Sequence, residues 1–96
     1  ETSPVMRGGD KIEVLVPVGN VDAVPSRFAW QPVPGAIRYR FELLNDEARV
    51  VQREVVVDTE LTLEGAPTRG VWRVVALDEL GGELLSSAAT RFEVVD

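Results

Sequence analysis

The chain of 96 residues contains neither cysteine nor histidine. Without cysteine it can form no disulfide and carries no thiol chemistry. Without histidine it lacks the commonest metal ligand and the commonest general base at neutral pH. Ser86 and Ser87 therefore have no histidine that could activate them as nucleophiles. We expect a chain that is not an enzyme, with no catalytic residue, no cofactor and no metal site.

Basic side chains and long apolar runs are also scarce. Ten basic residues face 16 acidic ones, Lys11 is the only lysine, and the net charge is −6. Nucleic acids and anionic membranes attract basic surfaces, so this balance disfavours both as partners. No apolar run reaches the roughly 18 residues that a membrane span needs. We therefore predict no nucleic-acid partner and no direct membrane insertion by this segment.

The hydrophobic content of 45% is enough for one core, and the length fits one domain. Apolar and polar residues alternate with a period of two, which is typical of strands with one buried face. Residues 1–10 are polar and glycine-containing, and we interpret them as a flexible leader before a domain at 11–96. Strands are expected at 11–16, 26–31, 37–44, 49–57, 61–63, 71–77 and 84–95, with an interruption at 86–89.

Turn signals recur roughly every 8 to 12 residues between these segments, and no connection could hold a crossover helix. The prediction is an all-β fold, an antiparallel sandwich of about seven strands. Its inner faces would take Ile12, Val14 and Val16 from the first strand. The third strand would contribute Ile37, Tyr39, Phe41 and Leu43, which alternate with polar residues in the sequence.

Several short patterns occur in an order that resembles fibronectin type III modules. The second strand carries a tryptophan preceded by an apolar residue, and a proline-containing turn follows it. Next comes a strand in which a tyrosine is followed by alternating apolar residues. Spaced leucines, a strand that contains a tryptophan, and a glycine-containing turn follow in that order. The residues are Phe28 and Trp30, 31–36, Tyr39 to Leu43, Thr59, Leu61 and Leu63, Trp72, Val74 and Ala76, 81–87, and Phe92 to Val94.

This resemblance covers roughly residues 11–95, and Trp72-Arg73-Val74 is similar to the bacterial branch of these modules. The family's corner tyrosine has no counterpart, because Gly70 occupies its position, so the broader immunoglobulin-like class stays an alternative. The resemblance implies a non-catalytic interaction or spacer module. Its setting would be the extracytoplasmic part of a larger bacterial cell-envelope protein, such as a membrane-anchored regulator, tethered through a segment preceding residue 1.

A different function would be a carbohydrate-binding accessory module of a secreted hydrolase. Sugar binding of that kind needs a row of exposed aromatic rings. The chain has six aromatic residues in all, and each falls on a predicted inner face. The alternation therefore counts against this reading.

Charged and apolar side chains are both expected on the outer face of the sheet. Arg38, Arg40, Arg53 and Arg73, together with Glu42 and Glu54, could form a mixed-charge ladder across neighbouring strands. Val51, Val55, Val75 and Leu77 would lie among them as an exposed apolar patch. This set of eight arginine and apolar positions is the predicted partner surface, for another protein, a neighbouring domain or a weak dimer.

The remaining acidic residues are interpreted as solvated or as turn residues. Asp46-Glu47 and Asp78-Glu79 fall on expected hairpin tips, where neighbouring side chains point apart. Calcium is the only metal that these groups could hold, through Asp58, Glu60, Asp78 or Glu79, but no calcium-loop spacing is present. Near the start, Arg7-Gly8-Gly9-Asp10 differs from an adhesive Arg-Gly-Asp tripeptide by one extra glycine.

Overall fold

A computed structural model of the protein describes residues 11–95. The predicted leader and the Arg7-Gly8-Gly9-Asp10 segment lie outside these residues, so the boundary between leader and domain stays a prediction. The described residues form nine strands and no helix, and they therefore contain no helix that could cross a membrane. The strands are β1 (Val14–Val16), β2 (Gly19–Val21), β3 (Arg27–Trp30), β4 (Arg38–Leu44), β5 (Val50–Val56), β6 (Glu60–Thr62), β7 (Arg69–Leu77), β8 (Glu83–Ser86) and β9 (Thr90–Val94).

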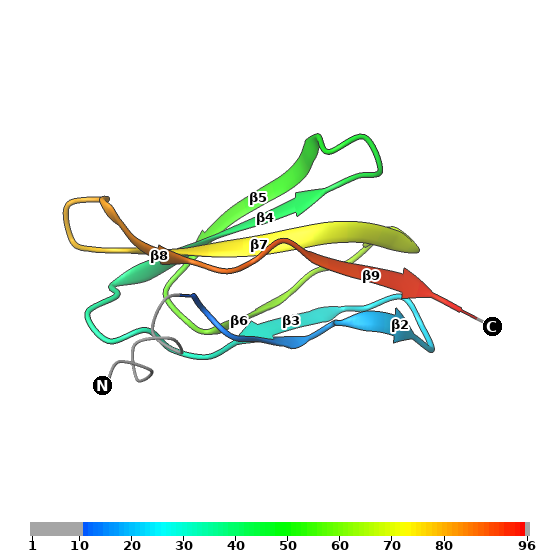
Figure 1. Cartoon of the computed structure of the whole chain (residues 1–96), viewed down its shortest axis with the longest axis horizontal. Coiled ribbons are helices and arrows are strands. Elements are labelled where there is room, and N and C mark those ends of the chain that lie inside the picture. The colour runs from blue at the N-terminus through cyan, green and yellow to red at the C-terminus, as the bar shows by residue number, and fades with distance from the viewer. Residues whose placement is uncertain (1–10, 96) are drawn as a thin grey trace, which may run out of the picture.

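Two sheets face each other across the core (Figure 1). One has the order β1-β3-β6, and the other has the order β2-β9-β7-β4-β5 with β8 also paired to β7. The all-β sandwich prediction is confirmed. The strand count is higher than expected because the closing segment is split into β8 and β9, and because β2 pairs parallel with β9. A strand as short as Gly19–Val21 carries too few residues to show a period of two.

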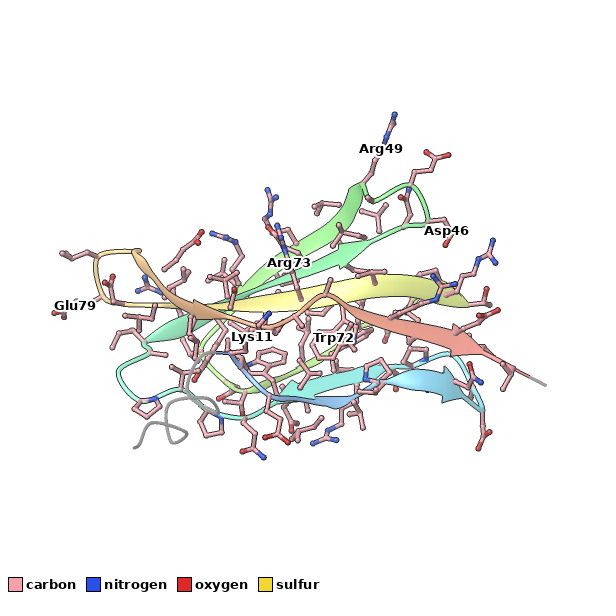
Figure 2. The ribbon with its side chains drawn as sticks, viewed as in Figure 1. Lys11, Asp46, Arg49, Trp72, Arg73 and Glu79 are labelled. Carbon is pink, nitrogen blue, oxygen red and sulfur yellow. The ribbon has the colours of Figure 1, made fainter. Side chains whose placement is uncertain are left out.

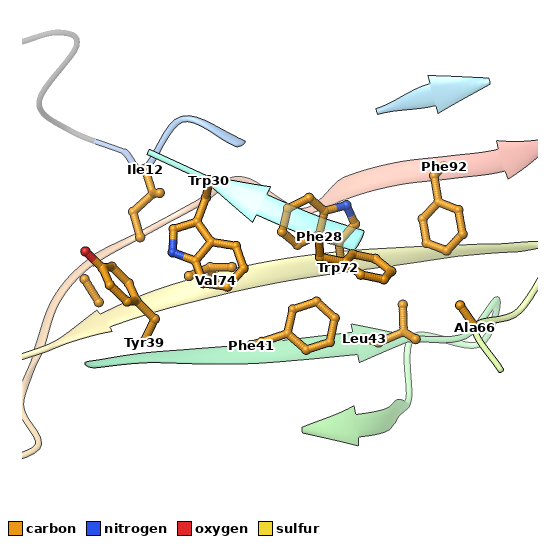
Figure 3. Close-up of a cluster of buried hydrophobic side chains, with 11 residues drawn as sticks. Ile12, Phe28, Trp30, Tyr39, Phe41, Leu43, Ala66, Trp72, Val74 and Phe92 are labelled. Carbon is orange, nitrogen blue, oxygen red and sulfur yellow. The ribbon is translucent and has the colours of Figure 1, made fainter. Parts of the chain in front are cut away.

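The six aromatic side chains fill the space between the sheets (Figure 3), and each is at most 4% exposed. Phe28 meets Phe41 and Trp72 edge to face, with ring centroids 5.0 and 5.3 Å apart. Each such pair stabilises by about 0.5–1.5 kcal/mol beyond the burial of area. The predicted inward orientation of the aromatic residues is therefore confirmed.

Two other inner-face predictions are wrong. Ile37 is exposed, because β4 begins only at Arg38 and Ile37 still belongs to the preceding turn, where its N–H donates to the Leu77 carbonyl at 2.8 Å. Val16 is exposed because the register of β1 against β3 shifts between Val14 and Val16. Such a shift sends a side chain to the other face of the strand.

Polar groups of the aromatic residues tie distant segments together. Trp72 donates its Nε1–H to the Pro17 carbonyl at 3.0 Å, in a buried contact between β7 and the connection from β1 to β2. The Tyr39 hydroxyl accepts the Val33 N–H at 3.0 Å and so holds the proline turn before β4. The buried Nε1 of Trp30 has no hydrogen-bond partner within residues 11–95 and lies on the side of the indole that faces Tyr39 (Figure 3).

Gly70, at the position of the missing corner tyrosine, is buried in β7. A Cβ atom there would lie 2.9 Å from the Leu44 carbonyl oxygen and close to Leu43 and Phe92. No side chain fits without a backbone shift. The departure from the family pattern therefore reflects close backbone packing at this point.

Ser87 organises the break between β8 and β9. Its Oγ accepts the Val74 N–H at 3.0 Å and donates to the Ala88 carbonyl at 3.0 Å, while its own N–H donates to the Val74 carbonyl at 2.8 Å. The hydroxyl thus satisfies a strand amide where pairing lapses. The interruption predicted at 86–89 lies at 87–89 in the structure, since Ser86 still pairs with Val75 in β8.

Candidate interaction surface

The outer face of β4, β5 and β7 gathers most of the basic side chains that the sequence singled out. In the register of the sheet, Arg53 lies opposite Glu42, and Glu42 lies opposite Arg73. Arg40 lies one row further, between Val55 and Val75. Figure 2 shows Trp72 and Arg73 on opposite sides of β7, with Trp72 toward the three-stranded sheet. We call Arg38, Arg40, Glu42, Arg53 and Arg73 the arginine face.

Glu42 is the centre of this face and is only 2% exposed. Its carboxylate accepts from Arg73 Nε at 2.6 Å and from Arg53 Nε at 3.0 Å, and Arg40 Nε lies 3.3 Å away. Burial by itself would raise the pKa of Glu42, but the hydrogen bonds and charges of the three arginines outweigh burial and lower that pKa. Glu42 is therefore a buried, ionised carboxylate.

The arginines differ in how they are held. Arg40 reaches outward to Glu83 with an Nη2 to Oε2 distance of 2.8 Å, a hydrogen bond that raises the pKa of Arg40 against the effect of burial. The side chains of Arg53 and Arg73 are 58% and 46% exposed, and Glu42 is their only ion-pair partner within residues 11–95. Both approach Glu42 through Nε. The planar guanidinium thus keeps Nη donors at its outer end, where solvent or a ligand can reach them.

The predicted partner surface is only partly exposed. Arg38, Arg40, Arg53, Val55 and Arg73 lie on the outer side as expected. Val51 is exposed but lies at a bulge, where the register of β5 against β4 shifts and assigns it to neither face. The expected exposure of Val75 and Leu77 is wrong, because these side chains are 4% and 6% exposed. They belong to the central strand β7, where the longer side chains of Arg40, Arg38 and Glu83 lie beside them in the register.

Glu54, predicted to join the charge ladder, lies on the other side of β5. It is paired with Phe41 in the register and accepts from Gln52 Nε2 at 2.6 Å. Side chains alternate across a strand, so a residue next to Arg53 cannot share its face. The sequence indicated a ladder of equal partners, whereas the structure has one buried carboxylate with arginines around it.

Charge is distributed unevenly between this face and the rest of the chain. Four arginines of the face stand against Glu42 and the neighbouring Glu83, which leaves a local charge of +2. The chain as a whole carries −6. A small basic surface on an acidic protein favours acidic ligands and repels most of the protein's own surface.

The carboxylates at the hairpin tips serve the turns. Asp78 Oδ1 accepts the amides of Leu80 and Gly82 at 2.9 and 2.7 Å, and Asp46 pairs with Arg69 at 2.8 Å. The two hairpins lie at different ends of the domain, as the positions of Glu79 and Asp46 show (Figure 2). Glu60, another suggested calcium ligand, pairs with Arg27 at 3.0 Å, and residues 11–95 bring no three carboxylates together.

A second surface feature was missed by sequence reasoning. A groove of about 530 Å³ lies between the start of the domain, the proline turn and β8, with Ile12, Pro32 and Leu85 among its lining residues.

The sequence also did not predict that Leu80, on the β7–β8 hairpin, projects into solvent. Leu80 sits in a turn, where no alternation predicts the direction of a side chain.

No protein-family model matches this sequence, and no curated protein matches it. Solved structures do share its fold. The fibronectin(III)-like modules of CbhA from Clostridium thermocellum superpose with a TM-score of 0.60 at 12% identity, over 88% of this chain and 99% of that chain. An Fn3-like protein from the same organism gives a TM-score of 0.60 at 18% identity, over 88% of each chain. The fold is thus that of a fibronectin type III-like module, which confirms the resemblance in the sequence.

Proposed function

We propose that this chain is a non-catalytic protein-interaction or spacer module in the extracytoplasmic part of a larger bacterial cell-envelope protein, with a membrane-anchored regulator as one such parent. The observation that carries the proposal is the arginine face. A buried carboxylate fixes the two exposed guanidinium groups of Arg53 and Arg73 on the sheet, which suits a recognition surface. The bacterial origin of the structural neighbours supports a bacterial source. The envelope setting rests on the resemblance in the sequence.

The chemistry of the ionisable groups supports a role without catalysis. An efficient general acid or base needs a pKa near the operating pH. The pKa of Glu42, the most deeply buried acidic side chain among residues 11–95, is lowered and so moves away from neutrality. Its position among three guanidinium groups keeps it ionised, as a structural anion.

Burial of the aromatic rings disfavours a carbohydrate-binding module. All six rings of the chain lie in the core and are at most 4% exposed. Stacking on a sugar ring needs an exposed aromatic face, and none of these residues offers one. We therefore place the interaction surface on the arginine face.

The test uses a photo-crosslinking amino acid in the full-length protein, expressed in its native host. Position 55 reports on the arginine face, and position 13, exposed beside β1, serves as the control. We expect one protein to crosslink from position 55 alone and to be lost when Arg53→Gln and Arg73→Gln are combined. Equal labelling from both positions, or labelling that ignores the two arginines, would count against an interaction through this face.

Location is tested separately with alkaline phosphatase and green fluorescent protein fused in turn to the end of the full-length protein. Phosphatase activity without fluorescence is the expected result for an exported module. The reverse pattern would remove the envelope setting and leave the interaction proposal intact.

A further inference from the structure

The strand β5 is an edge of the larger sheet, because it ends the order β2-β9-β7-β4-β5. Its outward side chains include Arg53 and Val55, and Val55 is 54% exposed. Val51 is also exposed, at a bulge where the register of β5 against β4 shifts. An edge strand presents unpaired backbone groups that can accept another strand. Charged residues usually protect such an edge, but here the charge is flanked by apolar surface.

The side chain of Arg53 is also ordered before any ligand binds. Its Nε bonds Glu42 at 3.0 Å, and that buried carboxylate is fixed in turn by Arg73 at 2.6 Å. A side chain that is already ordered loses less conformational freedom when it binds a ligand. The outer Nη donors of a guanidinium match a carboxylate in geometry and in charge.

We propose that β5 accepts an extended acidic segment of a partner protein as an added antiparallel strand. An aspartate or glutamate of that segment lies opposite Arg53, and an apolar residue two positions away lies over Val55. This inference rests on the proposed interaction function and names the partner chemistry and the docking mode. Arg73 contributes less than Arg53, because β7 lies two strands further from the added strand.

A second copy of this chain is a poorer occupant. The register puts Arg53 and Val55 on the outward face of β5 and Glu54 on the other face, so another copy of β5 would bring no carboxylate to that face. Two copies would also place two basic faces side by side in one sheet. Like charges directly opposite each other in a sheet are destabilising.

The experiment titrates the chain with the peptide acetyl-Thr-Val-Thr-Glu-Thr-Val-Thr-amide and follows backbone amide signals by NMR. We expect shifts and slower amide exchange confined to β5 and its hairpin. Replacing the central Glu of the peptide by Lys is expected to weaken binding about tenfold or more, the range of a lost charge-assisted hydrogen bond.

Variants of the chain give the matched comparison. Arg53→Gln should weaken the peptide about tenfold, and Arg73→Gln should weaken it less. Arg27→Gln removes an exposed arginine from the other sheet and should leave binding unchanged. All three sites are on the surface, so circular dichroism should report a folded domain in each case. Equal effects of Arg27→Gln and Arg53→Gln would overturn the proposal.

Three further outcomes would also overturn it. A glutamate homopeptide that binds as tightly without slowing amide exchange in β5 would indicate a diffuse electrostatic surface. Sedimentation that shows dimers abolished by Val55→Lys would assign the edge to a second copy. If the peptide does not bind but crosslinks from position 55 persist, β5 does not accept an added strand, although the interaction function stands. If the crosslinks are lost as well, the proposed interaction function also fails.

Discussion

The two faces of β4 and β7 use burial in opposite ways. On the inner face, Phe41, Trp72 and Val74 pack as apolar side chains against the other sheet. On the outer face, Glu42 and Val75 are as well buried, but Glu42 is charged. Apolar burial is favourable by itself, whereas a buried charge needs partners that replace water. Phe41 and Glu42 are neighbours in sequence, so substitutions within one strand can compare apolar burial with the burial of a charge.

The largest effect is expected on the inner face. Phe41→Ala should lower the free energy of unfolding by about 3–5 kcal/mol, because it leaves a cavity beside Phe28 and Trp72. Phe41→Leu should cost less, since most of the volume remains. Urea unfolding followed by tryptophan fluorescence measures both. Equal losses for the two variants would show that ring geometry matters more here than volume.

On the outer face, Glu42→Ala should lower the free energy of unfolding by about 1–3 kcal/mol. This is less than for a pair buried on both sides, because Arg53 and Arg73 are exposed enough to turn into water. A double-mutant cycle of Glu42→Ala with Arg73→Ala should give a coupling energy of about 0.5–3 kcal/mol. Independent effects of the two changes would mean that the contact at 2.6 Å carries no stability.

The two faces were not equally predictable from the sequence. Alternation correctly placed all six aromatic residues inward, because each lies in a strand where apolar and polar residues alternate with a period of two. It also put Arg53 and Arg73 on the outer side. The central role of Glu42 was not predictable, since the ion pairs join β4 to β5 and β7, and such contacts depend on register. Val75 was assigned to the surface because alternation gives a direction and says nothing of what lies over the side chain.

Ser87 combines burial with polarity on a smaller scale. Its hydroxyl is a neutral polar group that is buried where pairing between β7 and β8 ends. Ser87→Ala would leave the Val74 N–H without its partner and should cost about 1–2 kcal/mol. Ser86→Ala, at an exposed neighbour, is the control and should cost little. Faster hydrogen exchange at the Val74 amide in Ser87→Ala alone would confirm the assignment, and equal costs for both serines would contradict it.

The smallest expected effect is a change in the free energy of unfolding with pH in the acid range, which only substitutions on the outer face should alter. The pKa of Glu42 in the folded protein is lowered from its ordinary 4.5, so the unfolded chain takes up this proton at a higher pH than the folded protein does. The stability that Glu42 contributes is complete above about pH 4.5 and is lost as the pH falls through the lower, folded-state pKa. Unfolding of the wild type and of Glu42→Gln should therefore differ most near neutrality and converge in acid. A difference that stays constant across this range would mean that Glu42 is not the titrating group, and Phe41→Leu, which changes only the inner face, should run parallel to the wild type throughout.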